Sequence, residues 1–498
     1  MKIVNCVQKM FVDTYFLKDG KYYFLKEMKI LENNDSIWLK TNREDRKYRT
    51  LDKNIEVDVC IIGGGITGIS TAYYLSKEGG IKVAVFEKDK ICSKTTGKTT
   101  GKITSQHHLF YKYLIDSKGK EFAKKYLKAN EQAIKNIEEI INKESIECDF
   151  KRKKAYVFTK EPGKLQMIND EINAVKSLGM NAKFSNEIEV LGKIEGAIEF
   201  ENQAQFNPVK YVNGLSKCVL ENGGDIFENT KVTDYEKSES GFIVKAEADG
   251  KSRNIFAKYV VVATRYPIFN VPGFHFIKMY QELEYGIAIK TDVKLNGMYV
   301  SCEVPTISFR DYKDDAENYI LIVGNGHKTG EKTENNGFYV LEDFAKKYFP
   351  GSEIKYRWNA EDSIGLDKIP YIGEYSEVRE NMFVATGFKK WGMTSSNIAA
   401  NMITDMILKR ENKYEAIFKS TRVEPIKNKD EMINMLKEAG ENIVLPRLKL
   451  ENGKKYCAHL GCELTWNEVT KTWDCPCHGS RYEHDGKLIE GPAVHDLE

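Results

Sequence analysis

The sequence carries almost no excess of charge of either sign. Its 75 Lys and Arg residues nearly balance 73 Asp and Glu residues and leave a formal net charge of +2. Without a basic surplus to bind phosphates, we expect no nucleic-acid partner. The chain also lacks an apolar run of about 18 residues, the length that indicates a transmembrane helix. Residues 1–27 are mixed and then charged, so they do not resemble a signal peptide. We therefore expect a cytoplasmic protein with no membrane span.

Cysteine is sparse over most of the chain. Six of the ten cysteines are scattered before residue 303, and we interpret them as reduced thiols of the core or surface. The other four lie together near the C-terminus and need a separate explanation. The remaining composition, 41% hydrophobic and 30% charged over 498 residues, is ordinary for a globular protein of two or three domains.

Residues 57–87 organise the chain. They predict a buried strand, a glycine turn, a helix, a second strand and a terminal acid. Gly63 allows the tight turn, Gly65 lets the backbone approach a pyrophosphate, and Gly68 lets helix and strand pack closely. Glu87 is placed to bind a ribose hydroxyl. A glycine turn without a ligand would not explain this acid, so we predict dinucleotide binding.

A loop rich in threonine follows this unit. Residues 93–106 contain two successive T-T-G-K units, whose hydroxyls suit bonds to phosphate and flavin edges. A solvated Ser/Thr loop is the alternative. His107 and His108 come next, and either is a possible covalent attachment point for a flavin, although a plain surface or loop histidine is the simpler interpretation.

The middle of the chain predicts helices at 117–143, 164–178 and 207–220, the last with Asn207 as its cap. Short strands are expected at 156–159, 184–186, 197–200, 225–228, 242–247 and 259–264. A second group at 281–289, 299–303, 306–310 and 319–323 suits an antiparallel sheet. Arg310 in this group is the candidate for holding a substrate carboxylate through two parallel bonds, against the alternative of a structural arginine.

Residues 382–404 predict a strand, a loop and a helix that starts near Thr394. A helix N-terminus aimed at a flavin pyrimidine would stabilise the negative charge of the reduced ring. Trp358, Asp362 and residues 370–373 are expected in the loop before this strand.

Together, these motifs resemble the glycine oxidase/D-amino-acid oxidase (DAO) family of FAD enzymes over residues 55–410. The resemblance implies FAD, a two-domain fold and oxidation of an amine carbon–nitrogen bond by hydride transfer to the flavin. Because no cysteine is near Trp391 in sequence and Lys98 stands where some relatives have a histidine, we expect non-covalent FAD. The expected cofactor contacts, besides the glycines and Glu87, are Lys88, Thr95, Thr96, Thr99, Thr100, Val232, Ala263, Thr264, Gly387, Gly392, Met393 and Thr394, and the catalytic candidates are Arg310 and Thr394.

Near the C-terminus, Cys457 and His459 are followed after fifteen residues by Cys475 and His478. Zinc and a Rieske [2Fe–2S] cluster both use two cysteines and two histidines. One extra cysteine, Cys462 or Cys477, accompanies each pair. The pattern closely resembles the cytochrome bc type of Rieske protein. That resemblance implies that the cysteines of the pattern bind one iron and the histidines the other. It also implies that Cys462 and Cys477 form a disulfide, and that residues 491–493 shield the cluster.

The fold expected is an α/β FAD-binding Rossmann-like domain with an inserted α+β substrate domain built on an antiparallel sheet, plus a small all-β C-terminal Rieske domain. We expect an extension at 1–54 without assigned chemistry, the oxidoreductase at 55–410, a linker at 411–445 with a short helix near 431–439, and the Rieske domain at 446–498. Within the oxidoreductase, residues 55–110, 205–270 and 355–410 are assigned to FAD, and 150–200 and 275–350 to the substrate side.

The two modules together suggest an amine or amino-acid dehydrogenase that passes electrons from FAD to the Rieske centre and on to an external one-electron acceptor. Two alternatives stay open at this point. Electrons can run from a ferredoxin-type reductase through the cluster to the flavin, or the protein can be a non-enzymatic redox sensor or electron store.

Overall fold

The computed structural model describes residues 14–18, 21–25, 35–41, 47–314, 316–332, 337–422 and 454–497. The chain divides into two units, Met1–Asn34 and Asp35–Glu498. The first unit contains an antiparallel hairpin of β1 (Thr14–Lys18) and β2 (Lys21–Leu25). The predicted helix at 431–439 lies outside the described residues. All other elements belong to the second unit.

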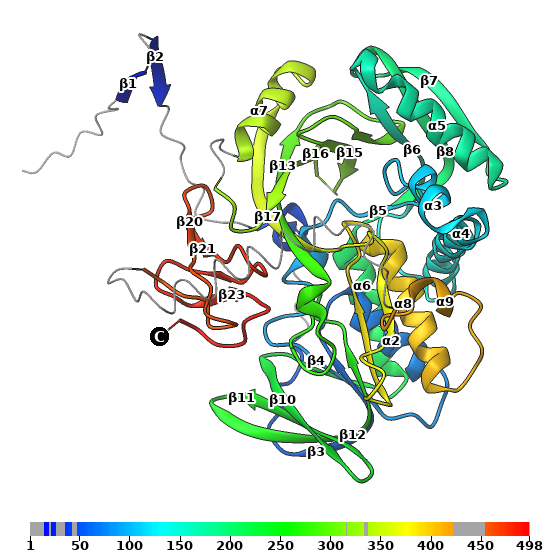
Figure 1. Cartoon of the computed structure of the whole chain (residues 1–498), viewed down its shortest axis with the longest axis vertical. Helices are drawn as coiled ribbons and strands as arrows, with labels where there is room; N and C mark the ends of the chain where they lie inside the picture. Colours follow the sequence, from blue (N-terminus) through cyan, green and yellow to red (C-terminus); the bar gives the residue numbers. More distant parts are fainter. Residues whose placement is uncertain are drawn as a thin grey trace, which may run out of the picture. The chain divides into compact units, whose positions relative to one another are not determined.

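An eight-stranded sheet carries the nucleotide motif (Figure 1). Its strand order is β10-β11-β12-β3-β4-β9, with β19 beside β12 and β18 beside β19. The pairs β3/β4, β4/β9, β12/β3 and β12/β19 are parallel and the others antiparallel. The strands are β3 (Ile55–Ile62), β4 (Val83–Phe86), β9 (Asp225–Phe227), β10 (Thr230–Ser238), β11 (Gly241–Ala248), β12 (Lys251–Val262), β18 (Tyr371–Glu374) and β19 (Met382–Thr386).

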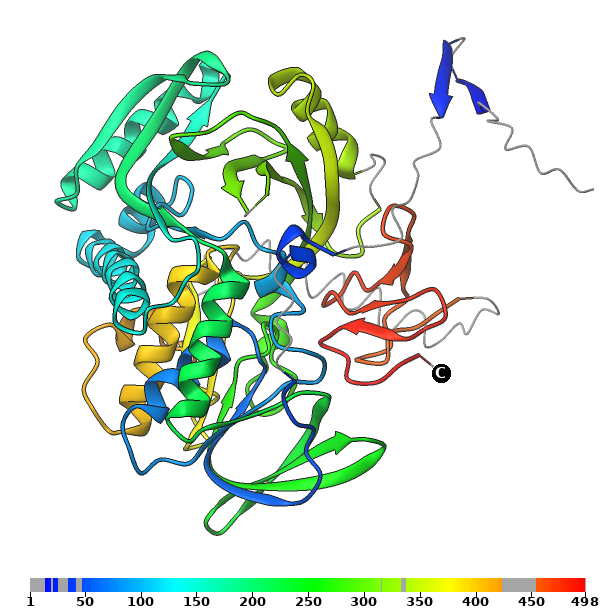
Figure 2. The same cartoon turned by 180° about the vertical axis from the view of Figure 1, so that it is seen from behind.

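Helices α2 (Ile66–Ser76), α6 (Pro208–Glu221) and α8 (Gly392–Ile407) lie side by side against this sheet (Figures 1 and 2). Strand β4 and the last four residues of β3 are buried, as expected of parallel strands covered on both faces. Asn207 caps α6 as predicted, because its side chain accepts the backbone N–H groups of Val209 and Lys210.

A nine-stranded sheet contains strands from both segments predicted for the substrate side, residues 150–200 and 275–350. Its order is β17-β13-β16-β15-β14-β6-β8-β5, with β7 beside β8. The two segments meet where β14 pairs with β6. This is the one parallel pair of the sheet among the described strands, and the other pairs are antiparallel. The strands are β5 (Lys102–Ile103), β6 (Lys151–Thr159), β7 (Ala182–Ile188), β8 (Gly192–Gln205), β13 (Met279–Lys290), β14 (Gly297–Ser301), β15 (Ile307–Lys313), β16 (Asn318–Lys328) and β17 (Glu353–Gly365).

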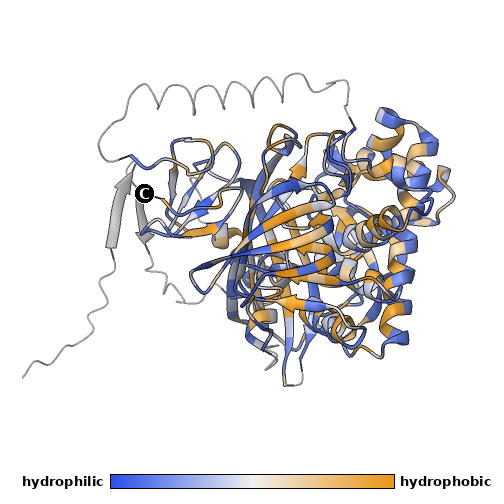
Figure 3. Cartoon of the chain, turned by 90° about the horizontal axis from the view of Figure 1, so that it is seen from below, coloured by the Kyte–Doolittle hydropathy of each residue, from blue (hydrophilic) through white to orange (hydrophobic). Residues whose placement is uncertain are grey.

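Helices α5 (Leu165–Ser177) and α7 (Gly337–Tyr348) pack against this second sheet, and α3 (Tyr111–Lys118) and α4 (Lys120–Lys143) lie beside the junction of the two sheets. Hydrophobic and hydrophilic residues alternate along many of the helices in Figure 3. In α4, the buried residues recur at helical spacing, including Ala133, Ile137 and Ile141. The predicted single helix at 117–143 is wrong at its start. Gly119, with φ of +90°, separates α3 from α4.

A second correction concerns the segment before β19. Trp358 and Asp362, expected in a loop, lie on the long strand β17, which pairs with β13 along its length, and residues 371–373 belong to β18. The strand was hidden in the sequence because it carries polar residues, Asn359, Glu361 and Ser363, that are buried instead of exposed. Their partners, described below, come from distant parts of the chain.

The C-terminal part forms a small antiparallel sheet in the order β20-β21-β22-β23. Its strands are β20 (Thr465–Asn467), β21 (Thr472–Asp474), β22 (Arg481–Tyr482) and β23 (Leu488–Glu490). The predicted fold class, with two larger sheets and a small all-β C-terminal domain, is confirmed. Within the described part of the chain, no helix is both long and apolar enough to cross a membrane.

Candidate active site and metal centre

The glycine turn between β3 and α2 opens onto a large cavity. Gly63 has φ of +109°, and a Cβ on it would lie 2.7 Å from the carbonyl oxygen of Ala263. A Cβ on Gly68 would lie 2.0 Å from the carbonyl oxygen of Gly63, so the first turn of α2 sits directly on the turn. Gly65 and Ile66 line the cavity at the N-terminus of α2. Free backbone N–H groups and the helix dipole favour an anion there.

Glu87 lies at the end of β4 and lines the same cavity. Its two carboxylate oxygens accept the backbone N–H groups of Gly64, at 2.7 Å, and Asp89, at 2.9 Å. Burial raises the pKa of Glu87 in spite of these bonds. A carboxylate offers about four acceptor positions, so two such bonds leave capacity for ribose hydroxyls.

The threonine-rich loop is held against α2 and against the segment before residue 54. Thr96 Oγ1 accepts the backbone N–H of Ile66 at 3.0 Å. Trp38, on the short helix α1 (Ile37–Thr41), donates its indole N–H to the carbonyl oxygen of Thr99 at 2.6 Å, and the Ser36 hydroxyl donates to the carbonyl oxygen of Gly97. Ser36 and Trp38 of the expected N-terminal extension therefore have a role that sequence reasoning missed. The one signal in the sequence was a tryptophan in a charged stretch.

Helix α8 begins at Gly392 and turns its N-terminus toward the cavity, which Gly392 and Met393 line. Thr394, the next residue of the helix, is buried, and its Oγ1 lies 3.3 Å from His107 Nε2. His107 stacks on Trp391 at a centroid distance of 4.9 Å and lies 2.7 Å from the Tyr126 hydroxyl. It is thus a buried residue and not a surface histidine. Burial lowers its pKa to about 3, which keeps the ring neutral.

The cavity has a volume of about 210 Å³ and is partly open to solvent. Most of the predicted cofactor contacts line it: Gly63, Gly65, Glu87, Lys88, Thr95, Thr96, Thr99, Val232, Ala263, Thr264, Gly387, Gly392 and Met393. Gly68, Thr100 and Thr394 are not among the residues that line the cavity.

Arg310 lies elsewhere. It is 1% exposed, and its guanidinium donates to the carbonyl oxygens of Thr100, Phe206 and Asp311 and packs over the Trp38 ring at 5.2 Å. These contacts support the threonine-rich loop from behind and leave no face for a substrate carboxylate. The strand was predicted correctly, but the direction of its side chain depends on packing that the sequence does not display.

The four C-terminal cysteines and two histidines converge in one small core. Cys462 and Cys477 form a disulfide. Cys457 Sγ lies 3.3 Å from the Tyr482 hydroxyl, and the two remaining thiols interact with each other, which lowers the pKa of Cys457 and raises that of Cys475. The rings of His459 and His478 are 5.0 Å apart at 87°.

These donors fit a two-iron cluster. The Nδ1 atoms of His459 and His478 are both buried, and neither has a hydrogen-bond partner among the residues that the structure describes. A metal ligand satisfies such an atom. Within the described chain, the only three Cys, His, Asp or Glu donors within 4.8 Å of one another are Cys462, Cys475 and Cys477, and two of these are consumed by the disulfide. A single zinc ion needs its ligands at about 2.0–2.3 Å from one point, so this spread favours two metal ions over one.

The cluster histidines face the flavin-binding part of the chain. His459 Nε2 lies 2.7 Å from Asn270 Oδ1, and the Phe276 ring meets His478 edge-on at a centroid distance of 5.6 Å. Gln281 donates its amide to the carbonyl oxygens of His478, at 2.8 Å, and Gly491, at 3.1 Å. The small domain is therefore seated on the loop and strand that follow β12.

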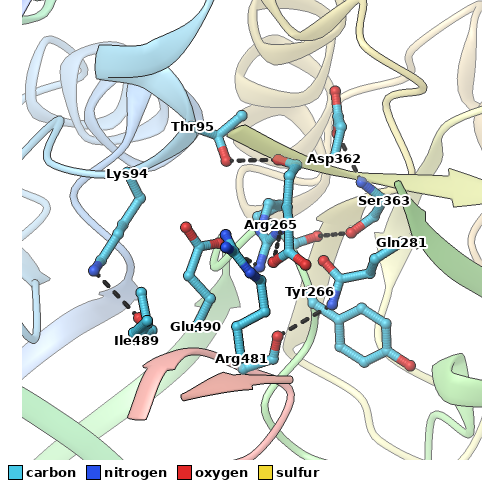
Figure 4. Close-up of polar contacts among 12 residues, drawn as sticks. Lys94, Thr95, Arg265, Tyr266, Gln281, Asp362, Ser363, Arg481, Ile489 and Glu490 are labelled. Carbon is cyan, nitrogen blue, oxygen red and sulfur yellow. Dashed lines mark hydrogen bonds and ion pairs between the residues drawn. The ribbon is translucent and has the colours of Figure 1, made fainter. Parts of the chain in front are cut away.

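A buried charge network completes this contact (Figure 4). Arg265 pairs with Glu361 of β17 at 3.1 Å and with Glu490 of β23 at 2.8 Å, and Arg481 donates to Asn359 at 2.9 Å. Burial opposes ionisation of Glu490, but Arg265 and neighbouring cations hold its pKa at about 2. Burial raises the pKa of Glu361. Sequence reasoning missed all of these residues.

The same network borders the cavity. Arg265, Tyr266, Asp362 and Lys390 line it from the oxidoreductase side, and the small domain adds the residues Leu488, Glu490, Gly491, Ala493 and Val494. One wall of the dinucleotide cavity is thus built by the domain that carries the cysteine and histidine donors. Such a site defines a flavin-dependent oxidoreductase with an attached iron–sulfur domain.

Comparison with known proteins agrees. The chain belongs to the FAD dependent oxidoreductase (DAO) family, whose model matches residues 58–406, and the Rieske [2Fe-2S] domain model matches residues 418–498. The cofactors of these two domains are FAD and a [2Fe–2S] cluster. The Rieske match begins inside the segment predicted as a linker, and the domain boundaries stay a prediction.

Three relatives illustrate the extent of the likeness. The chain is 33% identical to the putative Rieske 2Fe-2S iron-sulfur protein YhfW of Bacillus subtilis, over 94% of this chain and 97% of that protein. It is 22% identical to gamma-glutamylputrescine oxidoreductase of Escherichia coli, over 77% and 91%. The crystal structure of glycine oxidase from Geobacillus kaustophilus aligns with a TM-score of 0.61 at 18% identity, covering 74% of this chain and 99% of that one, which shows a shared fold.

Proposed function

We propose that the protein is a dehydrogenase that oxidises an amine or an amino acid, with electrons leaving through the Rieske centre to an external one-electron acceptor. The observation that carries this proposal is the shared cavity wall: Glu490 and Gly491 of the small domain line the cavity that Gly63 and Glu87 also line. The family and the likeness to an amine-oxidising relative support the substrate class.

The reaction balances as follows. The substrate carbon gives up a hydride and its nitrogen a proton, which leaves an imine that water hydrolyses to a carbonyl compound and ammonia. The two electrons of the hydride pass singly to two equivalents of acceptor, and its proton is released to solvent. FAD, when bound, supplies the two-electron acceptor, and the cluster supplies a one-electron carrier whose potential lies at roughly −150 to +300 mV.

The chain's own residues would bind FAD and orient it. The turn at Gly63–Gly65 and the N-terminus of α2 would hold the pyrophosphate, and Glu87 the ribose. The N-terminus of α8, at Gly392 and Met393, would stabilise negative charge on the reduced ring. No general base is assigned, because hydride transfer from an unprotonated amine needs none.

We further propose that FAD is held without a covalent bond. Cys92 is the one cysteine among the described residues that line the cavity, and it lies at the glycine turn, where its backbone N–H donates to the carbonyl oxygen of Gly64. Acid precipitation should release all of the flavin into the supernatant. Flavin that stays with the precipitate would contradict non-covalent binding.

Two cavity cations are already engaged with carboxylates. Arg265 pairs with Glu361 and Glu490, and Lys390 pairs with Glu282 and Glu284. An amino-acid substrate would need a cation for its own carboxylate. These two cations are therefore not free to hold a substrate carboxylate.

Anaerobic mixing with a panel of amines and amino acids tests the proposal. A true substrate should bleach the flavin absorbance first and the cluster absorbance second. A cluster that stays oxidised while the flavin is fully reduced would contradict the relay. Reduction by reduced ferredoxin, with no response to any amine, would instead support electron flow from cluster to flavin.

A further inference from the structure

One loop of the oxidoreductase touches both redox sites. It follows β12 and runs from residue 263 to residue 276. Its first residues, Ala263 to Tyr266, line the dinucleotide cavity. Its last residues reach the metal centre, since Asn270 contacts His459 and Phe276 contacts both cluster histidines. No other part of the described chain supplies contacts of this kind to both histidine rings and to the cavity.

Asn270 fixes the histidine edge of the centre. His459 Nε2 lies 2.7 Å from Asn270 Oδ1. If Nδ1 bound a metal ion, Nε2 would carry the hydrogen and donate it to this oxygen. An acceptor on the far nitrogen makes a metal-bound imidazole a stronger electron donor. Loss of that acceptor should therefore raise the reduction potential of the cluster.

Aromatic packing continues from the cavity to the same edge. Tyr266 lines the cavity, is 2% exposed, and belongs with Met279 and Tyr371 to a small apolar cluster against which Phe276 packs. Phe276 in turn meets His478 at 88° and His459 at 82°, with centroids 5.6 and 6.3 Å away. The Tyr266 hydroxyl has no hydrogen-bond partner among the described residues, so packing alone sets its place.

Buried polar contacts also hold the small domain against the oxidoreductase near this loop. Arg265 and Glu490 form an ion pair, and Gln281 clamps the carbonyl oxygens of His478 and Gly491. A Cβ on Gly479 would lie 2.7 Å from Gln281 Cβ, which shows how closely the backbones approach. Such directional contacts specify one docking geometry better than apolar packing does.

We propose that residues 263–276 form the bridge by which electrons pass between the flavin and the cluster of the same chain, with Asn270 as the positioning residue for His459. This inference rests on the proposed function only in that both cofactors are redox-active. The electrons enter the cluster through its histidine edge, and the transfer is intramolecular.

The test bypasses the amine. Flash photoreduction of the flavin in the anaerobic holoprotein, with 5-deazaflavin and EDTA, starts the transfer, and the cluster absorbance reports its rate. The rate constant should not change with protein concentration. A rate that rises in proportion to concentration would overturn the proposal. An amine panel that gives no turnover, with this rate intact, would count against the proposed function alone.

Variants of the loop sharpen the result. Asn270→Leu should raise the cluster potential in an EPR-monitored titration and slow the transfer by about 10- to 100-fold, the usual cost of losing such a support. A higher potential increases the driving force, so slower transfer must come from lost positioning. Asn270→Asp keeps an oxygen acceptor and should restore the rate.

Phe276→Leu should slow the transfer without changing the reduction potential of the cluster. This variant replaces Asn270→Leu in the test if Asn270→Leu does not take up the cluster. Val378→Ala is the control, because that side chain is 66% exposed and lies outside the bridge. Unchanged rates in both Asn270→Leu and Phe276→Leu would overturn the proposal.

Discussion

Arg265 and Glu490 form a buried ion pair, 2.8 Å from Nη2 to Oε2, between the loop that follows a nucleotide-sheet strand and the last strand of the iron–sulfur domain. The two residues are 225 positions apart in sequence (490 minus 265). Both line the dinucleotide cavity. The pair therefore joins the two domains at the point where flavin chemistry and iron chemistry would meet.

Removing one partner of this pair should destabilise the protein strongly. Arg265→Met leaves Glu490 and Glu361 buried without their shared cation, and we expect a loss of about 3–5 kcal/mol in unfolding free energy. The double variant Arg265→Met/Glu490→Met should recover part of that loss, because two apolar residues replace the pair. Urea unfolding of the two single variants and the double variant gives the coupling energy. Strictly additive losses would contradict a direct interaction.

Glu361 should make stability fall as pH rises. Burial raises its pKa in the folded protein above the unfolded value of about 4.3. A group with a raised pKa stabilises the fold fully below its unfolded pKa, and that contribution is lost as pH rises toward the folded value of about 8. Glu490, with its pKa lowered to about 2, behaves in the opposite sense and loses its contribution below about pH 4.

Thermal unfolding from pH 5 to pH 9 checks this prediction. Glu361→Gln should flatten the decline of Tm on the alkaline side and change little at pH 5. Glu239→Gln is the control, since that side chain is exposed and lies outside both sites. Equal slopes in Glu361→Gln and the wild type would show that Glu361 is not the group responsible.

The parts of the site that were predictable from sequence are those whose chemistry depends on neighbours along the chain. Gly68 is five residues from Gly63, whose carbonyl oxygen it approaches, and Cys457 and His459 are two residues apart, so local spacing displays their geometry. The cofactors and the fold class followed from these motifs.

The remainder depended on contacts between distant residues. His459 was predicted as a cluster ligand, but its contact with Asn270, 189 positions away in the sequence, forms only where the two domains meet. Arg310 lies on a predicted strand, but the direction of its side chain was set by Trp38, which comes from the far N-terminal side of the chain. The strand that carries buried Glu361 was not predicted. A polar residue buried at a domain interface breaks the alternation of apolar and polar residues that indicates a half-exposed strand.

Gly68→Ala should abolish FAD retention. Its new Cβ would meet the Gly63 carbonyl oxygen at 2.0 Å, which forces α2 away from the turn that receives the pyrophosphate. Overpacking of this kind costs about 1–3 kcal/mol. The flavin-to-protein absorbance ratio after gel filtration measures retention. Gly163→Ala is the control, since nothing lies within 4 Å of its added Cβ. Full flavin content in Gly68→Ala would contradict the close approach.

Arg310→Met should lower stability and flavin retention together. The guanidinium donates to the carbonyl oxygens of Thr100 and Phe206, and its loss leaves these buried acceptors without partners at about 1–3 kcal/mol each. A residue that held a substrate carboxylate would behave differently, raising KM while Tm and flavin content stayed normal. Thermal unfolding and flavin content, measured beside steady-state kinetics, separate the two outcomes.

Metal analysis provides the sharpest check on the C-terminal donors. The reconstituted protein should hold two iron atoms and two inorganic sulfides per chain, with the EPR signal of a reduced Rieske cluster. Cys457→Ser and His478→Ala should each remove the iron and that signal, while FAD stays bound, because neither residue lines the glycine-turn end of the cavity. Cys218→Ser, a thiol on α6 far from the cluster in sequence and outside its apolar core, should change neither cofactor. One zinc per chain, or iron retained in Cys457→Ser, would contradict the assignment of these residues as cluster ligands.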